Sequence, residues 1–217
     1  MKIHTLEFET KSNLLPPFAI PMGIKEFNPI TTIMLAKIIR DTEERILGIE
    51  CPVNLIESRW ITARLGYYNF LDFDYPQIHA LEKFISESYV EFLTGIQTPV
   101  EKIYCHAWVN IVRKGEQITK HNHADAHTNL PGCYSYLSGN LTIEADNTST
   151  NYESPYNGQL HRIPNQNGSM TLFPSFVMHH TSINKSEFPR LSIAFDIIPE
   201  TTYNLMTDNK HLFKELS

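Results

Sequence analysis

Two short polar stretches carry the side chains best suited to bind a metal ion. The first is His121-Asn122-His123-Ala124-Asp125, and the second, farther along the chain, is Met178-His179-His180-Thr181. In an extended segment residues i and i+2 project to the same side, so His123 and Asp125 can present an imidazole and a carboxylate to one point. A histidine from the second stretch would complete a set of two histidines and one carboxylate. Such a set leaves open positions on a divalent metal that activates oxygen or water.

A second group of chemically active residues lies near the end of the chain. Strand alternation over residues 190–198 places Arg190, Ser192, Ala194 and Asp196 on one face. The other face carries Leu191, Ile193, Phe195 and Ile197. A buried arginine is costly unless an anion is bound to it. A guanidinium can hold a carboxylate by two parallel hydrogen bonds, and a serine two residues along the strand can add a third.

A surface salt bridge is the alternative role for Arg190, with Glu187, Asp196 or Glu200 as its partner. Residue type alone favours this alternative, because most arginines are exposed. The two histidine-containing stretches favour an anion-binding arginine instead.

The elements that would position these residues are short strands that begin after residue 101. Residues 101–112 alternate, with His106, Trp108 and Asn110 on one side. Further short runs lie near 133–138, 140–145, 158–163, 169–173, 176–183 and 190–198, separated by turn sequences that contain glycine or asparagine. This number and spacing of strands predicts a β-sandwich or barrel.

The first hundred residues are predicted to support that β-structure from outside. Residues 2–9 indicate a weak strand, and Pro16, Pro17 and Pro21 interrupt regular structure after it. Apolar residues at helical spacing predict helices over about 29–47 and over 76–95, packed on one outer face. Between the helices, Arg59, Arg64 and a group of aromatic residues suit either packing against the sheet or a substrate mouth.

Composition restricts the class of protein. A chain of 217 residues suits a single domain with a sizeable core. The net charge of −6 comes without a basic run, which argues against nucleic acid and a membrane surface as partners. Three cysteines without paired spacing indicate a reducing compartment, and no leader or membrane-spanning run is visible, so we expect a cytoplasmic protein.

The motifs in residues 101–198 resemble those of the Fe(II)- and 2-oxoglutarate-dependent oxygenases. The resemblance is carried by an HxD stretch, a distal histidine, and Arg-x-Ser about ten residues beyond it. Within that superfamily a set of small oxygenases is similar in further stretches: Trp108-Val-Asn110, Gly132-Cys-Tyr134-Ser-Tyr136-Leu, and Phe173-Pro-Ser-Phe-Val-Met-His179 followed by Arg190-Leu-Ser-Ile-Ala-Phe. Residues 1–100 match no family.

The resemblance implies a mainly β fold with flanking α-helices, a double-stranded β-helix of the jelly-roll or cupin-like type. It would consist of a helical support region (1–100), the β-helix core (101–198) and a C-terminal extension (199–217) in one domain. Fe(II) would be bound by His123, Asp125 and His179, with 2-oxoglutarate as co-substrate and O2 as oxidant. The far carboxylate of 2-oxoglutarate would lie on Arg190 and Ser192. The resemblance also suggests Asn110, Tyr134 and Tyr136 as contacts around the iron or the co-substrate.

Several assignments stay open. His121 and His127 compete with His123, and His180 competes with His179, although an extended strand can turn only one of the latter pair to the metal. If His121 and His123 are the metal-binding pair, Asp125 is a surface residue. A cupin-like metal-dependent isomerase or dioxygenase, or a non-catalytic β-barrel binding protein, remain alternatives to the oxygenase.

The sequence indicates less about the substrate than about the metal site. The segment from Asp146 to Gln166 is predicted to be a long polar loop that could act as a lid. Its polarity favours hydroxylation of a polar substrate, which could be an amino acid, a peptide or a protein side chain. An apolar C-terminal stretch around Leu212 and Phe213 could pack on the domain or in a homodimer.

Overall fold

The computed structural model describes residues 1–8, 18–50, 60–123, 137–155 and 157–216. Asp125, His127, Tyr134 and Tyr136 of the predicted site lie outside these ranges, and so does most of the strand predicted over 133–138.

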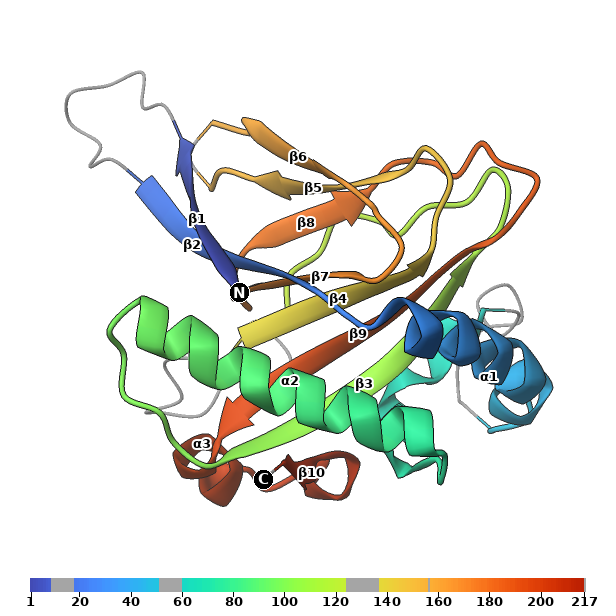
Figure 1. The fold of residues 1–217 in the computed structure, drawn as a ribbon, viewed down its shortest axis with the longest axis horizontal. Coiled ribbons are helices and arrows are strands. Elements are labelled where there is room, and N and C mark those ends of the chain that lie inside the picture. The colour runs from blue at the N-terminus through green and yellow to red at the C-terminus, as the bar shows by residue number, and fades with distance from the viewer. Residues whose placement is uncertain (9–17, 51–59, 124–136, 156, 217) are drawn as a thin grey trace.

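Two antiparallel sheets form the body of the molecule (Figure 1). The larger sheet has the order β1 (Lys2–Phe8), β2 (Phe18–Glu26), β7 (Ser169–Pro174), β4 (Leu137–Glu144), β9 (Arg190–Pro199), β3 (Ile103–Val112) and β10 (Lys214–Leu216). The smaller sheet has the order β6 (Leu160–Pro164), β5 (Ser149–Glu153) and β8 (Met178–Thr181). The sheets face one another, which confirms the predicted double-stranded β-helix.

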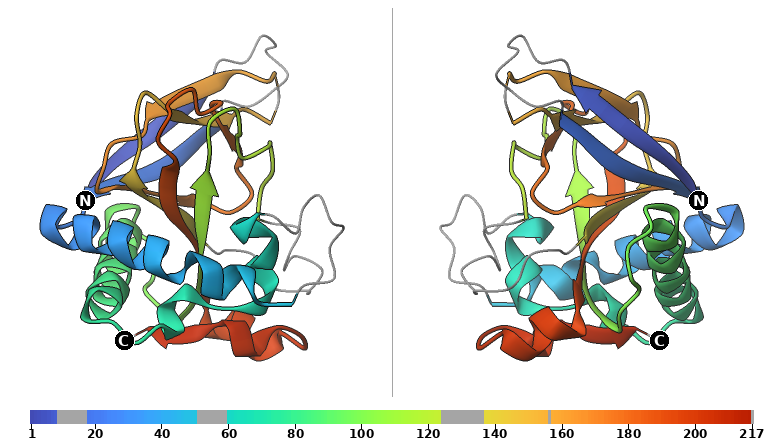
Figure 2. Two further views of the ribbon diagram at one scale, coloured as in Figure 1. Left: turned by 90° about the vertical axis from the view of Figure 1, so that its right-hand side faces the viewer. Right: turned by 90° about the vertical axis from the view of Figure 1, so that its left-hand side faces the viewer.

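Helices cover the outer face of the larger sheet, as the sequence predicts (Figure 2). Helix α1 spans Pro29–Leu47 and α2 spans Pro76–Gly95. Asn28 caps α1 by accepting a hydrogen bond from the Thr31 backbone, and Pro29 occupies the first turn, where its missing N–H is not needed. Shorter helices follow at η2 (Ile61–Tyr67), η3 (Phe70–Asp72), α3 (Glu200–Leu205) and η4 (Lys210–Leu212).

Strand β9 separates the apolar core from the interior between the sheets. Leu191, Ile193, Phe195 and Ile197 belong to the main hydrophobic core, which also includes the buried residues of α1 and α2. Arg190, Ala194 and Asp196 face the cavity between the sheets, and Ser192 is bonded to Arg190. The predicted alternation along this strand is therefore confirmed.

Gly139 lets β4 and β9 pack closely. It lies opposite Phe195 in the β4–β9 register, and a Cβ atom on Gly139 would overlap the Phe195 ring. Glycine at this position therefore leaves room for a large aromatic side chain in the core.

Two expectations about loops are wrong. Pro21 does not end regular structure but lies within β2, opposite Thr5 of β1. It is tolerated because β2 pairs with β7 only over Gly23–Glu26, so Pro21 lies beyond the stretch that has neighbours on both sides.

The segment from Asp146 to Gln166 is the second exception, because it is not a continuous loop: the run predicted over 158–163 is confirmed as β6, and β5 is a strand that the sequence did not predict. The polar residues Ser149, Thr150 and Asn151 of β5 are buried, whereas β6 alternates between exposed and half-buried residues. Thr150 donates to Asn165, and the Tyr152 hydroxyl is 2.8 Å from that of Thr171. The polar sequence wrongly suggested an exposed loop, because these side chains form hydrogen bonds with one another and can therefore be buried.

Among the described residues, no helix is both long enough and apolar enough to span a membrane.

Candidate metal centre and its cavity

Three histidines converge at one end of the space between the sheets. His121, His123 and His179 each offer a ring nitrogen, and these three atoms lie within 4.8 Å of one another. The backbone holds them there. His121 and His179 exchange two backbone hydrogen bonds of 3.0 and 2.8 Å, and the His123 amide donates to the Ser175 carbonyl at 2.9 Å. Residues 121–123 thus run alongside β8, and two-residue alternation brings both of their histidines to the same side.

Each of these imidazoles has an oxygen atom beside its Nδ1. The distances are 2.7 Å from His121 Nδ1 to the Thr119 carbonyl, 2.6 Å from His123 Nδ1 to Asp196 Oδ1, and 2.9 Å from His179 Nδ1 to the Val177 carbonyl. Carbonyl and carboxylate oxygens only accept, so Nδ1 must be the protonated nitrogen in all three rings. The Nε2 lone pairs are then left for a metal ion, and the residues fit such an ion.

Burial keeps two of the three rings neutral. Burial and the neighbouring imidazoles lower the pKa of His179 to about 3. Burial also lowers the pKa of His121. His123 differs, because the Asp196 carboxylate outweighs the effect of burial and raises its pKa above the ordinary value.

Asp196 is held in place behind His123. It accepts hydrogen bonds from His123 Nδ1 and from Ser138 Oγ, both at 2.6 Å, and Ser138 lies 2.8 Å from the Ser175 hydroxyl. Burial raises the pKa of Asp196, but the charge of His123 and these hydrogen bonds hold it below its ordinary value. Asp196 therefore remains a carboxylate.

A cavity of about 590 Å³ connects the histidines with Arg190. Its walls come from both sheets and from the segment that enters η2, and they include Trp60, Leu65, Trp108, Asn110 and Phe173. The volume is that of an ordinary small-molecule site.

Arg190 is a buried cation without a carboxylate partner among the described residues. Its side chain is 3% exposed, and Nη2 donates to Ser192 Oγ at 3.2 Å. Nε and Nη1 have no partner in the described part of the chain. Burial lowers the pKa of Arg190 to about 10, so the guanidinium is still charged at neutral pH.

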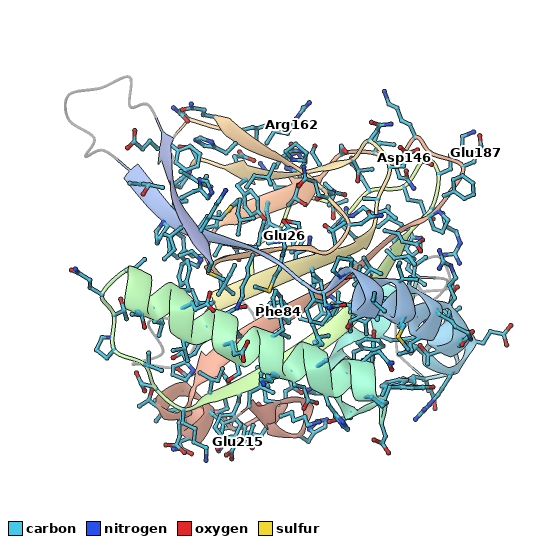
Figure 3. The ribbon with its side chains drawn as sticks, in the orientation of Figure 1. Glu26, Phe84, Asp146, Arg162, Glu187 and Glu215 are labelled. Atoms are coloured by element: carbon cyan, nitrogen blue, oxygen red, sulfur yellow. The ribbon has the colours of Figure 1, made fainter. Side chains whose placement is uncertain are left out.

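The surface salt bridge considered for Arg190 is wrong. Glu187 lies at the edge of the molecule and pairs with Lys114 (Figure 3). Asp196 is bonded to His123, and Glu200 pairs with Lys102 at 3.4 Å. All three proposed partners are thus engaged elsewhere.

The structure brings together most of the residues expected at the site. His123, His179, Arg190 and Asn110 line one cavity, and Ser192 is bonded to Arg190. Asn110 accepts a hydrogen bond from Thr62 at 2.8 Å, which ties β3 to η2. Asp125, Tyr134 and Tyr136 lie outside the described residues.

The sequence left two choices between histidines open: His179 or His180, and His121 or His123. The structure places these two pairs differently. His179 lines the cavity, whereas His180 is not among its lining residues and pairs with Asn151 of β5. His121, which the sequence leaves as a neighbour or competitor of His123, lies within the cluster, with its Nε2 atom 3.1 Å from His123 Nε2.

Sequence reasoning missed the contact of Asp196 with His123, and it did not name the residues near η2 that line the cavity. Alternation places Asp196 on the correct face, but nothing in the sequence pairs two residues so far apart. The segment around η2 serves both purposes that the sequence suggested, packing within the fold and lining a cavity. Trp60, Thr62 and Leu65 line the cavity, whereas Arg64 is buried and donates to the backbone carbonyls of Leu47, Ile49 and Trp60.

Comparison with known proteins agrees with this geometry. Residues 106–196, from β3 to β9, match the family model described as "Putative 2OG-Fe(II) oxygenase". No curated protein sequence matches the chain.

Three solved structures illustrate the structural similarity. A Pseudomonas putida prolyl-4-hydroxylase is 13% identical, with a TM-score of 0.55 over 82% of this chain and 88% of that one. The non-haem monooxygenase ThoJ in complex with nickel is 10% identical, with a TM-score of 0.57 over 82% and 74%. CytC3 with Fe(II) and α-ketoglutarate is 18% identical, with a TM-score of 0.53 over 81% and 71%. At these identities the structures show the fold alone.

The matched segment contains the histidine cluster, Arg190 and most of the residues that line the cavity. Over residues 106–196 the chain is therefore similar to the Fe(II)- and 2-oxoglutarate-dependent oxygenases, a family whose members use Fe(II), 2-oxoglutarate and O2.

Proposed function

We propose that the protein is a 2-oxoglutarate-dependent hydroxylase in which the histidine cluster holds Fe(II) and Arg190 binds the far carboxylate of 2-oxoglutarate. The observation that carries the proposal is the buried guanidinium of Arg190. Two of its nitrogens have no partner among the described residues, and it lines the same cavity as three convergent histidines. When bound, Fe(II) would activate O2, which is the oxidant, and 2-oxoglutarate would give two electrons on conversion to succinate and CO2, so that one oxygen atom could enter a substrate C–H bond.

Arg190 fits the carboxylate of a co-substrate for two reasons. A buried cation without a counterion is strongly destabilising, so an anion bound beside it restores electrostatic balance. The planar guanidinium offers a fork of donors, and Ser192, 3.2 Å from Nη2, stands beside that fork. We assign Arg190 and Ser192 to this carboxylate, with Asn110 and Tyr134 as further cofactor contacts.

His123 and His179 are proposed as two of the metal ligands. Their rings are oriented by Asp196 and by the Val177 carbonyl, respectively. Apolar rings surround them: Trp108 lies 5.4 Å from His123, and Phe173 lies 4.9 Å from His179, between ring centroids. These walls limit the access of water to the metal, which strengthens electrostatic interactions there. The third ligand is Asp125 by the HxD motif or His121 by its position.

The cavity supports a polar substrate, such as an amino acid, a peptide or a protein side chain. Its lining includes the polar groups of Thr62, Gln117, Asn122 and Asn140 in addition to the apolar walls. The cytoplasm is the proposed location because three cysteines without paired spacing suit a reducing compartment. We propose no nucleic-acid partner, because the net charge is −6, and leave a homodimer as a hypothesis for sizing measurements.

Arg190→Ala tests the proposal directly. Under anaerobic conditions, Fe(II) and 2-oxoglutarate together should give a visible metal-to-ligand charge-transfer band with the wild-type protein. Arg190→Ala should weaken 2-oxoglutarate binding by roughly 10- to 100-fold, the loss typical of hydrogen bonds to charged groups. Metal binding should be unchanged. Arg190→Lys should restore only part of the affinity, because lysine lacks the planar fork.

Arg162→Ala provides the matched control, because Arg162 lies on β6 at the outer surface (Figure 3). It should leave the titration unchanged. Absence of the band, together with no succinate released under air, would contradict the oxygenase proposal. A band that is insensitive to Arg190→Ala would instead favour a cupin-like metal enzyme, which needs no such arginine.

A further inference from the structure

We propose that Trp60 and Leu65 form the wall that recognises the substrate, and that the substrate carries a bulky apolar group, such as an aromatic ring, beside its polar groups. Both residues line the cavity that contains Arg190 and the histidines. This inference rests on the proposed function, since it names the kind of substrate that the same cavity would take. In an amino acid or a peptide, the recognised group would be an apolar side chain.

The first argument is that both side chains are large, apolar and only partly covered. Trp60 is 37% exposed and Leu65 is 38% exposed, whereas Trp108, another residue of the cavity wall, is 6% exposed. Trp60 and Leu65 line the cavity and also reach solvent, so they mark its mouth. A ligand group that covers them removes apolar surface from water, and only an apolar group gains from doing so.

The geometry of η2 explains why Leu65 faces the cavity. In a 3-10 helix, side chains three residues apart lie in the same row. Ile61 and Arg64 form a row that is buried in the protein, and Thr62 and Leu65 form the next row, which lines the cavity. The buried row anchors η2 and so sets the direction of the row that would meet a substrate.

Arg64 holds the wall in place. Its side chain is 6% exposed, and Nε donates to the carbonyls of Leu47 and Ile49 at 3.0 and 3.1 Å. Its Nη1 atom donates to the Trp60 carbonyl at 3.0 Å. Thr62 adds a side-chain hydrogen bond of 2.8 Å to β3. A wall that is ordered before binding loses little conformational freedom when a ligand arrives, which favours affinity.

The wall lies outside the part of the chain that carries the chemistry common to the family. The family match covers residues 106–196, and η2 precedes this segment. The common segment can therefore supply the reaction, while η2 supplies substrate choice. At about 590 Å³, the cavity has room for a ligand beyond a small dicarboxylate co-substrate. Gln117 and Asn122 line the same cavity and can bind the polar groups of the substrate.

Binding of small model compounds tests the inference without turnover. The probes are the N-acetyl amides of phenylalanine, leucine and glutamine, which share a backbone and differ in the side chain. Each probe is titrated into the full chain by ligand-detected NMR, with and without Zn(II) and 2-oxoglutarate. Zn(II) has no redox chemistry, so nothing is oxidised. We expect the phenylalanine probe to bind at least about fivefold more tightly than the glutamine probe, with the leucine probe between them.

Two variants remove the wall in different ways. Trp60→Ala should weaken binding of the phenylalanine probe by roughly 5- to 30-fold, because apolar area and a contact between rings are both lost. Trp60→Phe should restore most of the affinity. Leu65→Asn keeps the approximate volume of the side chain but makes it polar, and it should weaken the same probe by roughly 3- to 10-fold.

Tyr67→Ala is the matched control. Tyr67 lies on the same helix and is 46% exposed, but it is not among the residues that line the cavity. The substitution should leave the affinities for all three probes within about twofold of the wild type, as expected for a surface position.

Equal affinity for the phenylalanine and glutamine probes, or no binding of either in the millimolar range, would overturn the inference. A preference for phenylalanine that survives in both Trp60→Ala and Leu65→Asn would also overturn it, since the probe would then bind elsewhere. An Arg190-dependent charge-transfer band found beside either result would leave the proposed function standing. Conversely, Trp60-dependent binding by a protein that forms no such band would refute the proposed function and leave the wall as a site for an apolar group.

Discussion

Each cavity histidine is oriented by an oxygen atom from a different part of the chain. His121 has the carbonyl of Thr119, two residues before it, and His179 has that of Val177, likewise two residues before. His123 has the side chain of Asp196 on another strand. Local backbone geometry therefore orients two of the rings, and tertiary structure orients the third. Local orientation should make the first two rings less sensitive to substitutions elsewhere.

The neighbouring histidines of β8 provide a residue-level prediction. His179→Ala should reduce Co(II) affinity by at least 100-fold, because it removes a ring that lines the cavity. His180→Ala should leave the affinity within about threefold, because alternation turns this side chain away from the metal. Calorimetric titration of both variants measures the difference. Equal losses in the two variants would show that the β8 register is wrong.

Strand β9 contributes side chains to both the apolar core and the cavity. One face packs Leu191, Ile193 and Phe195 against the helical layer, and the other carries Arg190 and Asp196. A one-residue shift of this strand along its neighbours would turn the apolar face to the cavity and the polar face into the core. The register of β9 is thus set by the core, and the site residues on its other face are placed as a consequence.

Gly139 tests the packing of β9 at the level of the element. Gly139→Ala should destabilise the protein by about 1–3 kcal/mol, the usual cost of adding a methyl group to a filled core, because the new Cβ meets the Phe195 ring. Thermal unfolding should show a lower midpoint. Gly66→Ala is the control, since a Cβ there meets no atom within 4 Å, and it should change stability by less than about 1 kcal/mol.

At the scale of the whole molecule, the cavity lies between two sheets that also meet through an apolar cluster. The larger sheet packs on α1 and α2, whereas Tyr152 of the smaller sheet packs in a second cluster with Phe173 of β7. Ligands that bind groups from both sheets, such as His179 on β8 and Arg190 on β9, should hold the sheets together. Binding should therefore raise the stability of the fold as a whole.

Thermal unfolding with and without ligands tests this coupling. A ligand at 100 times its dissociation constant adds about 2.7 kcal/mol to the stability of the folded state. For a domain of this size that corresponds to a rise in Tm of roughly 5–11 °C. Co(II) should raise the Tm of both the wild type and Arg190→Ala. Addition of 2-oxoglutarate should raise the Tm of the wild type further and that of Arg190→Ala much less, and an equal rise in both would argue against Arg190 as its anchor.

The sequence by itself determined the local structure and the chemical groups. Helical spacing predicts α1 and α2 with their observed bounds, and alternation separates Arg190 and Asp196 from the apolar face of β9. These properties depend on residues close together in the chain, so their periodicity is visible in the sequence.

The tertiary structure decided which of these groups meet. It placed His121 in the cluster, His180 outside the cavity and Asp196 against His123, and it turned the polar segment around Tyr152 into the buried strand β5. Such pairings depend on strand order and register between distant segments. These pairings are stabilised by contacts between residues on different strands. Periodicity along the chain cannot predict such contacts, because it reflects only residues that are close in sequence.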